Sequence, residues 1–156
     1  MQLTFHEPFM QEALKEAQKA FIQKEIPVGA VVVLNHQIIG HGHNQTESKQ
    51  STLFHAELVA LRQASRRMHN WRLSNCELYV TLEPCTMCAG AIMLSRIRRL
   101  IYATPDPKAG AVQSTIAVLD NPALNHRVEV IQNILSKESS DLLKSFFKQL
   151  RQKKFC

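Results

Sequence analysis

Two short apolar runs with a helix-like segment between them constrain the fold of this chain more than any other part of its sequence. ELYVTL (residues 77–82) and RRLIYAT (residues 98–104) contain the β-branched and aromatic residues that favour strands. The segment EPCTMCAGAIML lies between them and is predicted to form a helix. A strand, a helix and a second strand in succession indicate a crossover connection, which joins parallel strands. We therefore expect a sheet with a parallel pair and helices on its faces.

The two ends of the chain are predicted to be helical, and an antiparallel hairpin is predicted after the first helix. Residues 7–24 and residues 136–152 place apolar side chains at helical spacing. AVVVL (residues 30–34) and QIIGHG (residues 37–42) are predicted to form the hairpin. The two residues between these runs do not include the glycine that short hairpins favour, so the sequence leaves the turn type open.

The remaining segments complete an alternating pattern of helices and strands. The polar segment NQTESKQST is predicted to be a loop that leads into a helix carrying His55, and TPDPKAGA is predicted to be a second loop. RVEVI (residues 127–131) is predicted to be the last strand. Together these segments predict an α/β fold with three α/β/α layers and a mixed sheet of about five strands.

Length and composition indicate one globular domain that spans residues 1–156. Apolar residues make up 45% of the 156 residues, which is enough for a core that needs no disulfides. The first residues, MQLTFHEPFM, do not have the basic and apolar segments of a signal peptide. No stretch approaches the roughly 18 apolar residues of a membrane span. We therefore expect a cytoplasmic protein without a membrane partner.

The chain has four cysteines, and two of them form a C-x-x-C pair at Cys85 and Cys88. In a reducing compartment such a pair indicates metal binding or redox chemistry rather than a structural disulfide. Cys76 precedes a predicted strand and is expected to be a small buried hydrophobic residue, whereas Cys156 is expected to have no specific role.

His55 and the two cysteines are candidate zinc ligands at the starts of two predicted helices. Zinc prefers four tetrahedral positions, and a site closed by four protein ligands is usually structural. No fourth cysteine or histidine lies beside this set, which leaves one position for water, as in catalytic sites. Helix N-termini also favour thiolate over thiol. The pattern therefore predicts a catalytic zinc site.

Glu57 is the candidate group for proton transfer, because it lies two residues after His55. A carboxylate across the site could accept a proton from water and later deliver it to a substrate. Each part has an ordinary explanation: an acidic residue suits the first turn of a helix, and C-x-x-C alone occurs in redox proteins. The combination of H-A-E and P-C-x-x-C is more specific than either part and favours zinc catalysis.

The formal charge of +6 favours anionic partners, nucleic acid first among them. A solvated helix face explains any one basic cluster equally well. The clusters are Arg62, Arg66, Arg67 and Arg72; Arg96, Arg98 and Arg99; and Lys148, Arg151, Lys153 and Lys154.

The combination H-x-E and P-C-x-x-C resembles the zinc nucleoside and nucleobase deaminases. Over nearly the whole chain the sequence is similar to the bacterial tRNA-specific adenosine deaminases. The similar stretches are IPVGAVVV, His43-Asn44, HAELVAL, NWRL, LYVTLEPCTMCAGAI, DPKAGA, LNHRVEV and SFFKQLR. Guanine and deoxycytidylate deaminases also use histidine as the first ligand, so the distinction rests mainly on NHR, DPKAGA and FFKQLR.

The resemblance implies a cytidine-deaminase-like fold and a reaction. Members of the family convert the wobble adenosine in the tRNA anticodon loop to inosine, and they are homodimers. The resemblance also implies one zinc ion per subunit here. Hydroxide on the zinc would attack the ring carbon that bears the amine. Glu57 would be the proton shuttle, first to the ring nitrogen and then to the leaving amine.

The resemblance also implies residues that contact the substrate. Asn44 is similar to the family's base-binding asparagine, and Asp106 is similar to its loop aspartate near the target nucleotide. Val28, Ala56 and Pro84 would line the pocket through packing and backbone contacts. Asn125, His126 and Arg127 match a family stretch to which we assign no individual roles.

Three other functions remain open from the sequence. A deaminase of free guanine or cytidine would share the chemistry, and its activity on nucleosides would distinguish it. A zinc-stabilised RNA-binding module would have no need of Glu57. A disulfide oxidoreductase would need Cys85 and Cys88 free of metal, which a zinc-to-protein ratio would test.

Overall fold

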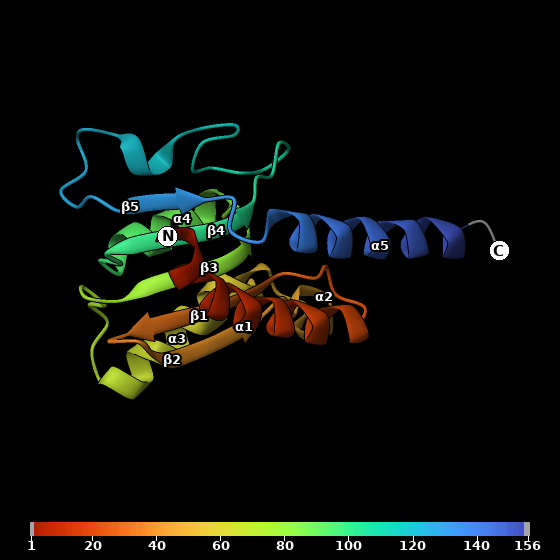
Figure 1. Ribbon diagram of the computed structural model, residues 1–156, viewed down its shortest axis with the longest axis horizontal. Coiled ribbons are helices and arrows are strands. Elements are labelled where there is room, and N and C mark those ends of the chain that lie inside the picture. The colour runs from red at the N-terminus through yellow and green to blue at the C-terminus, as the bar shows by residue number, and fades with distance from the viewer. Residues whose placement is uncertain (1, 155–156) are drawn as a thin grey trace.

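A five-stranded mixed sheet forms the centre of the computed structural model, which describes residues 2–154 (Figure 1). The strand order is β2-β1-β3-β4-β5. β1 pairs antiparallel with β2 and β3, whereas β3, β4 and β5 run parallel. The strands are β1 (Gly29–Leu34), β2 (Gln37–His43), β3 (Glu77–Leu82), β4 (Arg99–Thr104) and β5 (Glu129–Gln132). The predicted α/β class and five-stranded mixed sheet are confirmed.

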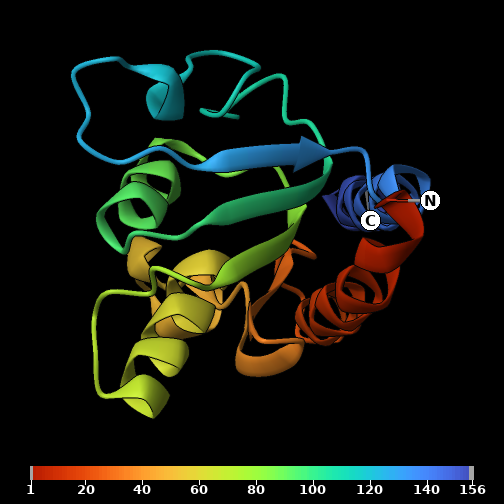
Figure 2. The ribbon, with the colours of Figure 1, turned by 60° about the vertical axis from the view of Figure 1, so that its left-hand side comes forward.

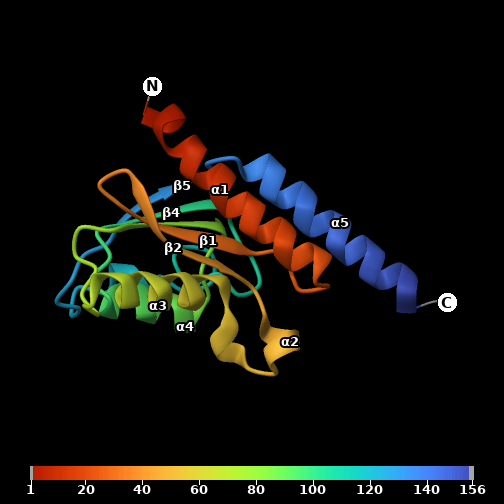
Figure 3. The same cartoon turned by 90° about the horizontal axis from the view of Figure 1, so that it is seen from below.

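Helices cover both faces of the sheet, as the crossover argument predicts. α3 (Ala56–Met68) and α4 (Thr86–Leu94) lie on one face, and α1 (Gln2–Ile22) and α5 (Ser136–Lys154) lie on the other (Figures 2 and 3). The core therefore has two parts. The larger cluster packs beneath α3 and α4, and the smaller one packs against α1 around Tyr79.

The hairpin between β1 and β2 closes without glycine. Its two connecting residues, Asn35 and His36, have φ values of 49° and 64°. Positive φ at both positions is the geometry of a type I′ turn, whose twist matches that of paired strands. Asparagine tolerates this conformation better than most residues, which explains how the turn forms.

α3 lies directly on β2 because two glycines of the strand face it. A Cβ atom on Gly40 would lie 2.4 Å from the carbonyl oxygen of Ala60, and one on Gly42 would lie 2.2 Å from that of Ala56. No side chain fits in either gap. This close contact fixes the start of α3, and therefore His55, against the edge of the sheet.

The segment predicted as a polar loop contains two short helices, α2 (Thr46–Lys49) and a 3₁₀ turn (Thr52–Phe54). The cause is a contact that is distant in sequence. Glu25 is 1% exposed, and its carboxylate accepts hydrogen bonds from the backbone N–H groups of Glu47 at 3.1 Å and Ser48 at 2.7 Å. The carboxylate thus caps α2, which local sequence patterns do not reveal.

Other boundaries differ from the prediction by a few residues. α1 begins at Gln2 rather than residue 7, because His6 and Phe9 hold its first turns against Tyr79. β5 begins at Glu129 rather than residue 127. A further 3₁₀ turn (Val118–Asp120) lies in the loop before it.

The C-terminal helix α5 runs past the edge of the sheet (Figure 1). Of its predicted apolar side, Phe146 is buried against Phe21, whereas Phe147 and Leu150 are 38% and 43% exposed. None of the described helices has the length and apolar character needed to cross a membrane. Cys76 is buried, as expected, and Cys156 lies outside the described residues.

Candidate active site

Two helix N-termini bring His55, Cys85 and Cys88 together. His55 is the N-cap residue of α3, and Cys85 is the N-cap residue of α4. The Nδ1 atom of His55 lies 3.6 Å from the Sγ atom of Cys85 and 3.5 Å from that of Cys88. Their ligand atoms all lie within 4.8 Å of one another, so the group could hold a metal ion.

The electrostatics of the three side chains favour a thiolate. The hydrogen bond from Cys88 and the contact with His55 lower the pKa of Cys85 to about 3. The pKa of Cys88 is instead raised, because its thiol donates to Cys85 and is buried. The contact with Cys85 also raises the pKa of His55. The thiolate form is the one in which a cysteine binds a metal ion.

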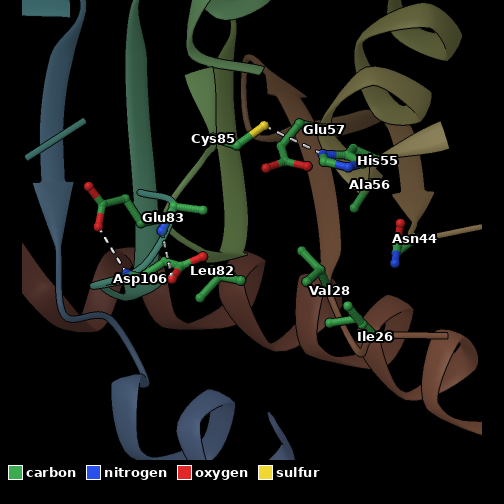
Figure 4. Close-up of a pocket in the computed structure, with 11 residues that line it drawn as sticks. Ile26, Val28, Asn44, His55, Ala56, Glu57, Leu82, Glu83, Cys85 and Asp106 are labelled. Atoms are coloured by element: carbon green, nitrogen blue, oxygen red, sulfur yellow. Dashed lines mark hydrogen bonds between the residues drawn. The ribbon is translucent and has the colours of Figure 1, made fainter. Parts of the chain in front are cut away.

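Glu57 lies in the first turn of α3 beside this group (Figure 4). It is 4% exposed, and burial raises the pKa of its carboxyl group to about 7. A carboxyl group with such a pKa exchanges protons readily near neutral pH. Its location and acidity therefore suit a proton shuttle beside the metal group, the name used here for His55, Cys85 and Cys88.

A cavity of about 170 Å³ is lined by two of the candidate metal ligands, His55 and Cys85, and by Glu57 (Figure 4). It contains four of the five residues predicted to contact substrate: Val28, Asn44, Ala56 and Asp106. Four further residues line it that no sequence motif indicated, which are Ile26, Leu82, Glu83 and Ala109. Most of the exposed surface of the cavity is apolar, and Asn44, His55, Glu57, Glu83 and Asp106 add polar groups to it.

Asn44 is buried at the end of β2 and held on two sides. Its backbone N–H donates to the Val28 carbonyl at 3.0 Å, and its side-chain Oδ1 accepts the Thr46 hydroxyl at 2.7 Å. With Oδ1 engaged in this way, the amide has a defined orientation in the cavity wall. Such a group can make a directed hydrogen bond to a ligand.

Asp106 begins the loop between β4 and β5 that closes the other side of the cavity. Its Oδ1 accepts hydrogen bonds from the backbone N–H groups of Lys108 at 3.0 Å and Ala109 at 3.2 Å. This turn lies in the segment predicted as a loop, TPDPKAGA, and it places Asp106 in the cavity wall.

Pro84 does not belong to the lining of this cavity, unlike the other four predicted residues. It is buried, and its carbonyl accepts a hydrogen bond of 2.8 Å from the N–H of Ala111. Pro84 therefore acts on the loop after β4, through its backbone.

Comparisons with known proteins show the family to which the chain belongs. Residues 5–151 match the family model described as MafB19-like deaminase. The chain is 42% identical to a tRNA-specific adenosine deaminase of Bacillus subtilis over 97% of this chain and 94% of the relative. It is 47% identical to one of Aquifex aeolicus, over 93% of this chain and 95% of the relative. The chain belongs to the tRNA-specific adenosine deaminase family.

Solved structures show how closely the deaminase fold is kept. One comes from work on A-to-I editing by tRNA:A34 deaminases at the wobble position of transfer RNA. It is 42% identical, with a TM-score of 0.83 over 86% of this deaminase and 97% of the other chain. A guanine deaminase from Nitrosomonas europaea is 23% identical, with a TM-score of 0.75 over 90% of this chain and 83% of that one. The second likeness shows only a shared fold.

The stretch Asn125, His126 and Arg127 of the deaminase has structural contacts away from the cavity wall. The His126 ring lies 2.7 Å from the Ile97 carbonyl, and Asn125 accepts a hydrogen bond of 2.7 Å from Arg96. Arg127 donates to the carbonyl of Asn121 at 3.0 Å. These bonds hold the long loop before β5 to the turn after α4.

Proposed function

We propose that this protein hydrolyses the exocyclic amine of adenosine at the wobble position of tRNA, producing inosine and ammonia. The observation that carries the proposal is a cavity lined by His55, Cys85 and the buried Glu57, with Cys88 beside the first two, in a member of the tRNA-specific adenosine deaminase family. We propose that the protein acts in the cytoplasm as a homodimer with one zinc ion per subunit.

The donor set and its spacing support zinc as the metal. Zn–N bonds of about 2.1 Å and Zn–S bonds of about 2.3 Å at a tetrahedral angle place the two donor atoms about 3.6 Å apart. The observed separations from His55 to Cys85 and Cys88 are 3.6 Å and 3.5 Å. Zinc held by these three residues would lower the pKa of a water molecule and make it a nucleophile near neutral pH.

Glu57 would carry the proton through the reaction. In hydrolysis the ring carbon forms a bond to the oxygen of water and loses its bond to the amine nitrogen. Glu57 would accept a proton from the water and deliver it to the ring nitrogen beside that carbon. It would then take the remaining proton of the added hydroxyl group and transfer it to the amine, which leaves as ammonia. The pKa of about 7 lets Glu57 act in both directions.

The cavity and the charge of the chain fit a base presented by RNA. An anticodon loop is partly unstacked, so one base can enter a pocket at small energetic cost. Asn44 would bind that base through its oriented amide, and the apolar wall around Val28 and Ala56 would pack against its faces. The formal charge of +6 would attract the phosphates.

The proposal is tested by comparing substrates with the zinc-loaded protein. We expect inosine in a tRNA that carries a wobble adenosine and no detectable product from free adenosine, guanine or cytidine. Faster turnover of a free base or nucleoside than of tRNA would instead identify a small-molecule deaminase with the same chemistry.

The basic end of α5 is predicted to bind phosphates. Lys153 and Lys154 lie in the last turn of α5, and both are exposed. Replacing both with alanine should weaken tRNA binding and reduce the slope of log affinity against log salt by roughly 0.7 for each lost single-strand phosphate contact. Zinc content and saturating turnover should not change.

A control variant removes the same charge elsewhere. Lys15 and Lys19 of α1 are also exposed and pair with Glu12 and Glu16. Their double alanine variant should keep the wild-type salt slope, measured by tRNA affinity across a salt series. An unchanged slope in the Lys153 and Lys154 variant would mean that the end of α5 is only solvated.

Asn44→Ala should change the turnover and leave the salt dependence of tRNA binding as it is. The substitution removes a directed hydrogen bond to the base, so turnover should fall roughly tenfold or more while the salt slope stays the same. Zinc content should stay at the wild-type level, because the metal group is intact. Single-turnover rates on tRNA measure the effect, and unchanged turnover would show that Asn44 does not bind the base.

A further inference from the structure

Glu83 has the most heavily hydrogen-bonded carboxylate in the described part of the chain. It follows β3 directly, is 3% exposed, and precedes the candidate metal ligand Cys85 by two residues. Its Oε1 atom accepts the backbone N–H groups of Val112 at 3.2 Å, Gln113 at 2.8 Å and Ser114 at 2.9 Å. Its Oε2 atom accepts the N–H of Asp106 at 2.9 Å and the Ser114 hydroxyl.

All five donors belong to one loop, residues 106–114, which wraps around the carboxylate. The loop has no space to move inward. A Cβ atom on Gly110 would lie only 2.3 Å from Oε2 of Glu83. The N–H of Glu83 donates to the Thr104 carbonyl at 2.9 Å, which ties the carboxylate to the strand that leads into the loop.

An unprotonated carboxylate matches this set of five donors, because both of its oxygens accept hydrogen bonds. A charged acceptor forms stronger hydrogen bonds than a neutral one. An amide in its place has one acceptor oxygen and one donor group, so it cannot accept all five bonds.

Figure 4 shows the consequence for the cavity, because Glu83 and Asp106 lie side by side on one wall and are joined by the hydrogen bond to the Asp106 N–H. Asp106 has no strand or helix of its own to position it. Two sets of hydrogen bonds hold its turn. The Asp106 carboxylate accepts the N–H groups of Lys108 and Ala109, and the Glu83 carboxylate accepts the N–H of Asp106. The second of these contacts connects it to the strand that ends at the metal group.

We propose that Glu83 is a positioning residue whose carboxylate holds the 106–114 loop so that Asp106 stands correctly in the cavity wall. The part of this proposal that concerns substrate rests on the proposed function. Glu83 acts on the loop, and through Asp106 it sets how well the target nucleotide is bound. It does not ligate the metal and does not transfer protons.

Glu83→Gln is the main test, because it keeps the volume of the side chain and removes charge and one acceptor. Glu77→Gln is the matched control at the other end of β3. Glu77 is also a poorly exposed glutamate, and it accepts hydrogen bonds from Arg99 and from Tyr79 at 2.9 Å. Within the described residues its hydrogen bonds go to Tyr79 and Arg99 and not to the 106–114 loop, so the substitution should affect stability alone.

The first readout does not depend on activity. Hydrogen exchange of a peptide spanning the loop should become at least about tenfold faster in Glu83→Gln, the size expected for losing a hydrogen bond to a buried charge. Glu77→Gln should leave exchange in the loop unchanged. Zinc content should equal the wild-type value in both variants. Loss of zinc in Glu83→Gln would overturn the proposal, because Glu83 would then act through Cys85.

The second readout is kinetic. On wobble-adenosine tRNA, Glu83→Gln should raise KM about tenfold or more with a smaller change in kcat. In an Asp106→Ala background the same substitution should change kcat/KM by less than about twofold, because residues that act as a unit are not additive. An undiminished effect in that background would contradict the route through Asp106.

Ser114→Ala tests the same contact from the side of the loop. If Glu83→Gln does not fold, Ser114→Ala removes one donor to the same carboxylate and should produce a smaller change in loop exchange in the same direction. If Glu83→Gln folds and the amide hydrogens of the loop exchange at the wild-type rate, the proposal is wrong. A wild-type protein that deaminates no tRNA would refute the proposed function, whereas the exchange experiment would still decide whether Glu83 holds the loop.

Discussion

Replacing Glu57 with alanine is expected to abolish deamination while bound zinc stays in place. The three candidate ligands remain in the variant, so metal content should not change. A positioned proton-transfer group typically contributes about 10²–10⁴-fold to a rate. Glu57 would serve several steps, so we expect a loss at the top of that range or beyond. Single-turnover rates on tRNA and zinc per chain measure the two quantities.

Glu57→Gln is the matched control for packing. The glutamine side chain has nearly the same volume as the buried Glu57 side chain, which is 4% exposed. It cannot accept and release the proton of the water molecule. Both variants should therefore be inactive and fold normally. Activity within a few-fold of the wild type in either variant would remove Glu57 from the mechanism.

Substituting either candidate thiolate ligand is expected to remove both zinc and activity. In Cys85→Ser or Cys88→Ser a neutral hydroxyl replaces a thiolate, and it is a poor ligand for zinc. The protein should also lose stability, because a ligand that binds only the folded state contributes about 4 kcal/mol at a thousandfold excess over its dissociation constant. Zinc analysis and thermal unfolding with and without a chelator measure both effects.

Cys76→Ala provides the control for losing a buried cysteine. Cys76 is fully buried, and its thiol contacts the sulfur of Met68 rather than the metal group. The variant should lose some packing energy and keep stoichiometric zinc. Stoichiometric zinc in both Cys85→Ser and Cys88→Ser would show that the ligand set is wrong.

The fold was largely predictable because its pattern is local. The strand-helix-strand run of residues 77–104 indicates a parallel pair by its composition alone, and β1, β2 and β3 lie within one residue or so of the predicted runs. The hairpin turn was less predictable, since Asn35 and His36 adopt positive φ without glycine. α2 was missed because Glu25, far from it in sequence, supplies the cap.

The candidate site was predictable where its chemistry requires particular residue types. His55, Glu57, Cys85 and Cys88 stand out because a metal ligand or a proton carrier allows few alternatives. Glu83 was not singled out, although it lies within the same motif. Its role depends on five donors from a loop that follows the next strand, and no local pattern announces such a contact. Ile26 and Leu82 look like ordinary core residues in the sequence.

The most direct test of the account is to incubate the zinc-loaded protein with a tRNA transcript that carries a wobble adenosine and to sequence the product. Matched transcripts should carry that adenosine one position away or have guanosine in its place. We predict inosine at the wobble position of the first transcript, none in the other two, and none with Glu57→Ala. Inosine at the shifted adenosine, no inosine in any transcript, or full activity in Glu57→Ala would contradict the account.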